Sequence, residues 1–226
     1  MFIEKIHQNI SAKNLLNHPF YHLWSEGKLS QEILADYAKQ YYPHVEAFPR
    51  YVSLIHSQSN NLDDRQVLLE NLIEEERGSE NHPKLWRDFA FSLGNTHDEL
   101  KNVKQYQNTE YLVQKFFDLC KQSYASGLGA LYAYEYQTPE ISKTKIKGLK
   151  EFYNIYTQEA LKFFEVHEKA DEWHSEEVAG LIEKLSKEEK QEALQAASIA
   201  ADALWGFLDG MMVAHNLEKE CKTCND

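Results

Sequence analysis

Apolar residues recur every three or four positions along most of the chain, the spacing of helices with one buried face. Runs with strict alternation of apolar and polar residues, which would indicate strands, are almost absent. Only 9 glycines and 5 prolines interrupt the pattern. The pattern predicts an all-α protein of about eight helices. We expect them at Ile6–Leu16, Gln31–His56, Asp63–Glu76, Pro83–Leu93, Thr109–Gln137, Ile141–Tyr153, Thr157–Leu185 and Glu188–His215.

Several local signals support the predicted helix boundaries. Ser30 and Ser186 stand where N-caps are expected, and Ser186 is followed three residues later by Glu189, as in a capping box. Pro83 fits the first turn of its helix. Pro43 and Pro49 lie inside the second predicted helix, and we expect them to kink or break it.

Composition narrows the function classes. The formal net charge of −12 argues against binding to nucleic acid or to an anionic membrane. The start of the chain lacks the pattern of a signal peptide, and no apolar run approaches the roughly 18 residues of a membrane span. The 3 cysteines do not suggest a disulfide framework. We therefore expect a cytoplasmic protein with one helical domain, residues 1–215, and a polar tail, residues 216–226.

The most informative segment carries His167, Asp171 and His174. Their spacing of i, i+4 and i+7 places them on one side of a helix, within the apolar stripe of that helix. Burying three ionisable groups is costly unless something compensates, and a bound metal ion is a common compensation. The alternative is an ordinary i,i+4 pair and a hydrogen-bonded core histidine.

Other predicted helices supply further candidate ligands. Glu75 continues the apolar stripe of its helix and His82 follows seven residues later, although spacing alone does not separate Glu75 from Glu74 and Glu76. Glu135 is the last residue on one face of the predicted helix Thr109–Gln137, in a segment that is rich in small residues. Three carboxylates and three imidazoles suit a pair of iron or manganese ions, whereas structural zinc favours thiolates. A solvated, acidic helix end is the alternative for the glutamates.

The chain resembles the haem-oxygenase-like di-metal oxidases, which are related to thiaminase-type and pyrroloquinoline-quinone-synthesis proteins. The resemblance covers almost the whole chain. It rests on segments around Phe20–Leu29, Asp36–Tyr42, Ala47–Tyr51, Glu75–Gly78, Ala130–Glu135, Lys145–Leu149, His167–His174 and Gly206–Asp209. It implies a single bundle of seven to eight helices and a homodimer. It also implies a centre of two metal ions, Fe/Fe or Fe/Mn, held by Glu75, His82, Glu135, His167, Asp171 and His174.

The resemblance also implies an activity, the formation of p-aminobenzoate for folate synthesis with dioxygen and an external reductant. By position, Tyr21 matches the tyrosine that supplies the aromatic ring, Tyr37 a second tyrosine near the site, and Lys145 the amine donor. The ring must lose its phenol oxygen, gain nitrogen at that carbon, and keep one side-chain carbon as a carboxyl group. Without the resemblance, the sequence would place Lys145 among several lysines on the solvent-exposed face of its helix.

Two other functions stay open at this stage. The enzyme could oxidise or cleave a bound small molecule; Cys120, followed by Tyr124, resembles the nucleophile segment of the thiaminase-type relatives. Alternatively, the chain could bind host death domains, as a chlamydial member of the family does, although no sequence feature supports this directly. Cys221 and Cys224 in the tail form a Cys-x-x-Cys pair that could transfer electrons or bind metal.

Overall fold

A computed structural model describes residues 1–219, except for the side chains of residues 169–172. Within this part the structure is all-α, as predicted, and contains no strand. Nine helices correspond to the eight predicted ranges, because the predicted helix at 109–137 is two helices in the structure. They are α1 (Ile3–Ser11), α3 (Gln31–Gln58), α4 (Leu62–Glu76), α5 (His82–Ser92), α7 (Gln107–Gln122), α8 (Tyr124–Glu135), α9 (Thr138–Tyr153), α10 (Gln158–Glu183) and α11 (Lys187–Ala214).

The expected count of seven to eight helices is too low for the described residues. Two short helices, α2 (Pro19–Ser25) and α6 (His97–Lys101), were not predicted, because each is shorter than the window in which helical periodicity shows. The predicted helix at 109–137 is divided at Ser123, whose backbone is extended. The Ser123 side chain accepts a hydrogen bond from the Ser126 N–H and so caps α8.

The two internal prolines do not break α3; a break was one of the two predicted outcomes, the other being a kink. Pro43 and Pro49 both lie inside the continuous helix Gln31–Gln58. This helix packs against α4, α5, α7 and α8. Tertiary packing of this extent outweighs the roughly 3 kcal/mol that a proline costs in a helix interior.

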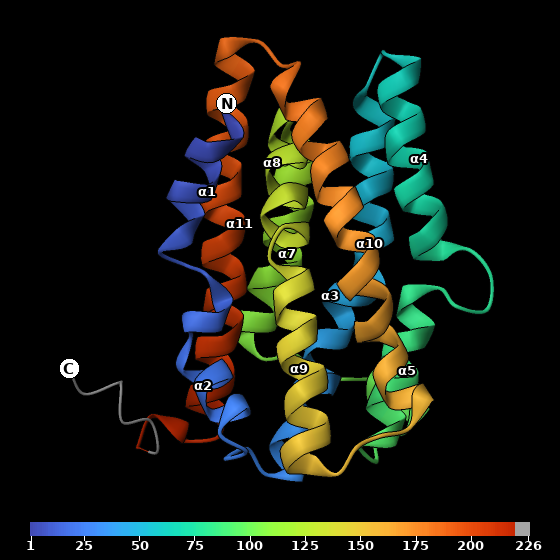
Figure 1. Cartoon of the computed structure of the whole chain (residues 1–226), viewed down its shortest axis with the longest axis vertical. Coiled ribbons are helices and arrows are strands. Elements are labelled where there is room, and N and C mark those ends of the chain that lie inside the picture. Colours follow the sequence, from blue (N-terminus) through green and yellow to red (C-terminus); the bar gives the residue numbers. More distant parts are fainter. Residues whose placement is uncertain (220–226) are drawn as a thin grey trace.

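Helix α8 lies at the centre of the bundle, between α11 and α10 in Figure 1, and all its residues from Ala125 to Glu135 are buried. Its small residues allow neighbouring backbones to come close. A Cβ atom added at Gly129 would lie 2.1 Å from the carbonyl oxygen of Ala193 in α11. This close packing places the last residue of α8, Glu135, in the interior of the bundle.

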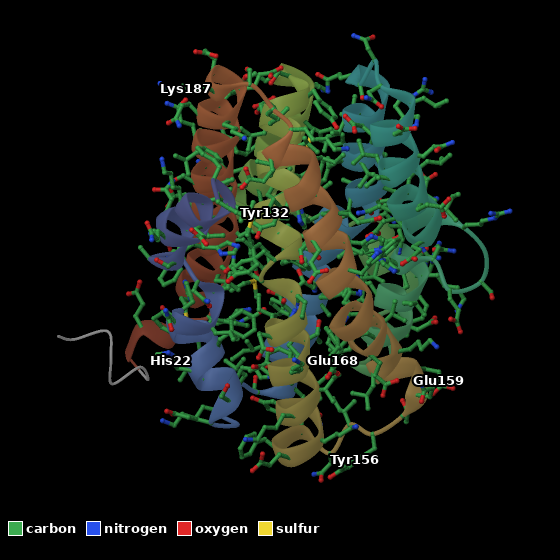
Figure 2. The ribbon with its side chains drawn as sticks, turned by 45° about the horizontal axis from the view of Figure 1, so that its top comes forward. His22, Tyr132, Tyr156, Glu159, Glu168 and Lys187 are labelled. Atoms are coloured by element: carbon green, nitrogen blue, oxygen red, sulfur yellow. The ribbon has the colours of Figure 1, made fainter. Side chains whose placement is uncertain are left out.

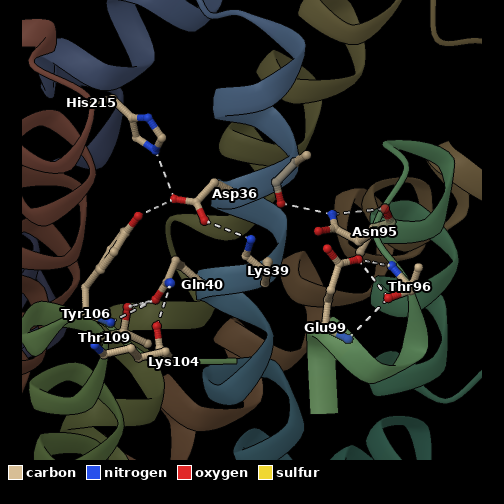
Figure 3. A network of polar contacts seen from close by, with 12 residues as sticks. Asp36, Lys39, Gln40, Asn95, Thr96, Glu99, Lys104, Tyr106, Thr109 and His215 are labelled. Carbon is tan, nitrogen blue, oxygen red and sulfur yellow. Dashed lines mark hydrogen bonds and ion pairs between the residues drawn. The ribbon is translucent and has the colours of Figure 1, made fainter. Parts of the chain in front are cut away.

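A polar network on the outer face of α3 sets the rotation of this helix (Figure 3). Asp36 accepts hydrogen bonds from the Tyr106 hydroxyl, at 2.7 Å, and from the His215 ring, at 2.9 Å. Gln40 accepts from the backbone N–H of Tyr106, at 3.0 Å. These hydrogen bonds attach α3 to the segment before α7 and to His215 at the end of α11. Tyr37 and Tyr41, which each follow one of these polar residues in α3, are buried in the bundle.

Helix α11 is, among the described helices, the one long and apolar enough to cross a membrane by length and composition. However, 56% of its most apolar window is buried inside the structure. It packs mainly against α8, α7 and α1. After it, residues 217–219 form a short 3₁₀ turn, and Cys221 and Cys224 lie outside the described residues.

Candidate metal centre and adjoining tyrosine–lysine cluster

Four helices bring the candidate metal ligands together. Glu75 lies at the end of α4 and His82 at the start of α5, separated by a turn in which Gly78 adopts a φ of +77°. The Asn81 side chain caps α5 by accepting from the Lys84 N–H at 3.0 Å. Helix α10, which carries His167 and His174, packs against α4, α5 and α8 (Figure 1). Local turn chemistry and helix packing thus direct residues that are distant in sequence to one place.

Glu75, His82 and His167 form the closest group. Each offers one ligand atom, and these three atoms lie within 4.8 Å of one another. The Nδ1 atom of His82 lies 2.8 Å from a Glu75 oxygen, which is the distance of an ion pair. Burial lowers the pKa of His82, but Glu75 outweighs this effect and raises it. The His82 and His167 rings are 4.2 Å apart. A carboxylate and two imidazoles that converge in this way suit a shared metal ion.

The other two histidines each use one ring nitrogen within the protein. His167 donates Nδ1–H to the Phe163 carbonyl oxygen at 2.7 Å, which leaves Nε2 with a lone pair. Burial, first of all, and the neighbouring His82 lower the pKa of His167, so the ring is neutral. The Nε2 atom of His174 lies 2.9 Å from Glu74 Oε2, while its buried Nδ1 has no partner. Metal-bound histidines in proteins usually have this arrangement.

Glu135 contributes a buried carboxylate. One oxygen accepts from the Asn71 amide at 2.5 Å, and the other, Oε2, is buried without a hydrogen-bond partner. Burial raises the pKa of Glu135 to about 8; the Asn71 hydrogen bond opposes the shift, and Glu75 and Glu177 add to it. A bound cation would remove this penalty on the charged carboxylate.

The residues present therefore fit a metal ion. The donors are oxygen and nitrogen atoms, which suit iron and manganese, and several of them are buried without a partner. Glu135 and His174 do not belong to the closest group of three, although both are buried. The side chain of Asp171 lies outside the described residues, while its backbone continues α10. The roles of the six residues as ligands stay predictions.

A second buried cluster contains Tyr21, Tyr37 and Lys145. The Lys145 Nζ atom donates to the Tyr37 hydroxyl at 2.7 Å, and that hydroxyl lies 3.5 Å from the hydroxyl of Tyr21. The side chains of all three are buried, with Lys145 exposed by only 5%. Rings that surround the Lys145 Nζ atom, with centroids 5.1–5.8 Å away, belong to Tyr21, Tyr37, Tyr41, Trp86 and Phe164. The structure therefore places the three predicted residues in mutual contact.

The aromatic surroundings change the charge state of Lys145. Burial lowers the pKa of its amine from the usual 10.5 to about 7. A neutral amine has a lone pair and is a nucleophile, whereas an ammonium is not. By contrast, burial raises the pKa of Tyr21 and of Tyr37 above the ordinary value, so both phenols stay protonated.

A small cavity of about 30 Å³ adjoins this cluster and is lined by Tyr21, Tyr37, Lys145, Phe163 and Leu204, among others. A cavity of this size has room for one or two water-sized molecules. It is far smaller than the roughly 300 Å³ of ordinary small-molecule pockets. An aromatic substrate does not fit beside Tyr21 without movement of the surrounding helices.

Phe163 and Tyr134 connect the two clusters. Phe163 lines the cavity, and its carbonyl oxygen orients His167. Tyr134 also lines the cavity and directly precedes Glu135 at the end of α8. The Tyr41 hydroxyl interacts with Tyr134, and the Tyr41 ring stacks on Tyr37 at 5.8 Å. The tyrosine–lysine cluster and the candidate metal centre are thus adjacent parts of one site.

Sequence reasoning missed two residues of this site. Asn71 holds Glu135, and Glu74 holds His174. Asn71 lies four residues before Glu75, so a polar residue on the buried stripe was a signal that could have identified it. By sequence, Glu74 is only an alternative to Glu75 as a metal ligand. The structure buries Glu75 and leaves Glu74 partly exposed.

Cys120 does not belong to this site. It is buried on α7, and burial raises the pKa of its thiol to about 12. The thiolate needed for nucleophilic attack is therefore not populated near neutral pH. Cys120 is also not among the residues that line the cavity.

Replacing Lys145 with methionine is expected to stabilise the protein below pH 7. Between about pH 7 and 10 the unfolded chain binds a proton at Lys145 that the folded protein does not bind, so stability of the native protein rises with pH across this window. The variant lacks this rise and should be more stable by a few kcal/mol at pH 6. Urea unfolding at pH 6, 8 and 10 measures the difference. The control is Lys147→Met on the exposed side of α9; parallel curves for wild type and Lys145→Met contradict the expectation.

Comparisons with known proteins show the family to which the chain belongs. Residues 35–205 match the family model described as iron-containing redox enzyme. The chain is 41% identical over 212 residues to 4-aminobenzoate synthase of Chlamydia muridarum, with 93% of this chain and 90% of the relative covered. It is 41% identical over 222 residues to 4-aminobenzoate synthase of Nitrosomonas europaea, with 93% and 90% covered.

Solved structures show the same fold at low sequence identity. A TenA homologue from Pseudomonas syringae pv. tomato superimposes with a TM-score of 0.80 at 20% identity, with 94% of this chain and 93% of that chain covered. A domain with a haem-oxygenase-like fold from Shewanella denitrificans gives a TM-score of 0.76 at 19% identity, with 99% and 95% covered. The fold is therefore haem-oxygenase-like, as expected. The chain belongs to the family of iron-containing redox enzymes and is a homologue of the 4-aminobenzoate synthases.

Proposed function

We propose that this chain is an oxygen-dependent p-aminobenzoate synthase that makes its product from its own Tyr21, with Lys145 as the amine donor. The observation that carries the proposal is the buried contact from Lys145 through Tyr37 to Tyr21, beside the Glu/His group. The 41% identity to proteins named 4-aminobenzoate synthase supports the same activity.

The proposed metal centre contains two ions, Fe/Fe or Fe/Mn, held by Glu75, His82, Glu135, His167, Asp171 and His174. When bound, the ions would supply the activation of dioxygen, with electrons from an external reductant. Burial of the described ligands, none exposed by more than 5%, keeps bulk water from the reaction. Asn71 and the Phe163 carbonyl hold Glu135 and His167 in place.

Lys145 and Tyr37 prepare the amination. Near neutral pH a large fraction of the Lys145 amine is uncharged, because its pKa is lowered by burial to about 7. The hydrogen bond to Tyr37 holds the nitrogen 5.8 Å from the centre of the Tyr21 ring. Both residues are already buried together, so no amine has to diffuse to the ring.

The small cavity favours a substrate that belongs to the protein. About 30 Å³ accommodates a molecule of the size of dioxygen but not an added aromatic ring. In the proposed reaction the Cα–Cβ bond of Tyr21 and the Cε–Nζ bond of Lys145 break. Dioxygen oxidises the Tyr21 Cβ to the carboxyl group, the phenol oxygen leaves as water, and the Lys145 nitrogen takes its place on the ring. Each chain can therefore form one product molecule at most. The proposal includes a homodimer, as the family resemblance implies, and a cytoplasmic location, as the composition of the sequence indicates.

The proposal is tested by supplying purified protein with Fe²⁺, Mn²⁺, dioxygen and a chemical reductant, but with no aromatic compound. We expect p-aminobenzoate to appear and to stop at or below one molecule per chain. Omission of dioxygen should prevent its formation. Repeated turnover of an added small molecule, without change to the protein, would instead favour an oxidase that acts on a bound substrate.

A further inference from the structure

The candidate metal centre is closed to solvent. Glu75, His82, Glu135, His167 and His174 are each exposed by 5% or less. An ion that reaches them from solution must first pass side chains nearer the surface. Charged side chains that touch the centre and also reach solvent are therefore candidates for a first binding step.

Glu74 is such a side chain. It precedes the buried Glu75 on α4, and its own side chain is 43% exposed. Its Oε2 atom lies 2.9 Å from the Nε2 atom of His174, which is buried. Glu74 thus connects solvent directly with a residue of the candidate centre.

Glu177 adds a second carboxylate beside the same histidine. It follows His174 by three residues on α10, and its Oε2 atom is buried without a hydrogen-bond partner. Residues three apart on a helix lie on the same side of it, and His174 contacts Glu74 at 2.9 Å, so both carboxylates lie beside the His174 ring. Within the described part of the chain, no lysine or arginine forms an ion pair with Glu74 or Glu177.

Glu135 marks the inner end of this line of acidic groups. Its buried Oε2 atom has no partner, and Glu177 contributes to the raised pKa of this carboxyl. The line runs from the partly exposed Glu74, past His174 and Glu177, to the buried Glu135. Carboxylate oxygens in this order offer ligands to a divalent ion at each stage, and the Oε2 atoms of Glu177 and Glu135 have no hydrogen-bond partner.

We propose that Glu74 and Glu177 form an outer binding site beside His174 that captures a divalent metal ion and passes it to the buried centre. This inference rests on the metal centre of the proposed function. The two carboxylates attract the ion and replace part of its water shell, since carboxylate oxygens suit Mn²⁺ and Fe²⁺. Their role is in the rate of loading, because they lie outside the six predicted ligands.

The test compares wild type with the double variant Glu74→Gln/Glu177→Gln. Glutamine has the shape of glutamate, and its amide oxygen still accepts a hydrogen bond from His174, so the ring keeps its orientation while the charges are lost. Stopped-flow absorbance with Co²⁺ follows loading, and elemental analysis gives the final metal content. We expect loading to slow by about tenfold or more, whereas the final content at saturating Co²⁺ should equal that of wild type, because glutamine keeps the hydrogen bond that holds His174.

Two further variants make the result specific. Glu76→Gln removes one charge from the next residue of α4, which is exposed and outside this line, and should load like wild type. Glu74→Asp/Glu177→Asp keeps both charges and should load faster than the glutamine variant. An unchanged rate in Glu74→Gln/Glu177→Gln overturns the outer site, and so does a lower final content at an unchanged rate. A wild-type chain that binds no Co²⁺ contradicts the metal centre itself.

Discussion

Replacing Tyr21 with phenylalanine is expected to abolish p-aminobenzoate formation and to leave the fold and the metal content unchanged. The substitution removes one oxygen atom, and the buried ring keeps its contacts with Phe20 and Trp24. A phenyl ring lacks the hydroxyl that makes a phenol easy to oxidise. It also lacks the oxygen that lies 3.5 Å from the Tyr37 hydroxyl. Mass spectrometry of the small-molecule fraction after one reaction, with elemental analysis of iron, measures both outcomes.

Tyr156→Phe is the matched control for this experiment. Tyr156 is 61% exposed and lies in the connection between α9 and α10, far from the bundle interior (Figure 2). This variant should form product like wild type. If Tyr21→Phe also forms product at the wild-type yield, Tyr21 only lines the cavity and the ring comes from elsewhere.

Replacing His167 with alanine is expected to remove metal and product together. His167 belongs to the closest group of ligand atoms, and its ring is already oriented by the Phe163 carbonyl. Loss of an outer partner of a metal ligand typically costs about 10–100-fold in metal affinity, and loss of the ligand itself should cost more. Metal content after reconstitution with Fe²⁺ and dialysis measures the effect.

His97→Ala serves as the control for the histidine substitution. His97 starts the short helix α6 and is exposed, so its loss should change neither metal content nor product. Circular dichroism should show that both variants remain helical. Retention of the full metal content by His167→Ala would exclude His167 from the centre and would contradict the ligand set.

Much of the fold could be predicted because its signals are local. Ser30 accepts from the Ile33 N–H, and Ser186 forms the predicted capping box with Glu189. The division at Ser123 was missed because serine in an apolar pattern fits a helix interior as well as an N-cap. The sequence alone did not decide between a kink and a break at Pro43, because the packing of α3 against its neighbouring helices is not visible in its own sequence.

The candidate site could be predicted only in part. The spacing of His167 and His174 placed both on the buried side of α10, where the structure has them. Lys145, however, could not be distinguished from Lys147 and Lys150 by its sequence context. Only the family resemblance identified it as the candidate amine donor. The structure buries Lys145 and leaves the other two exposed. Which lysine faces the interior depends on how α9 rotates against its neighbours, and no local signal encodes that rotation.

The most direct test of the proposed function determines whether the aromatic ring of the product comes from a tyrosine of the protein. Protein produced with ring-¹³C₆ tyrosine is transferred to unlabelled buffer, loaded with metal, and allowed to react with dioxygen and a reductant. We predict p-aminobenzoate that carries all six labelled ring carbons, at no more than one molecule per chain, with a matching mass change in the peptide that contains Tyr21. Unlabelled product, or an unchanged Tyr21 peptide after product has formed, would contradict an origin in the protein's own tyrosine.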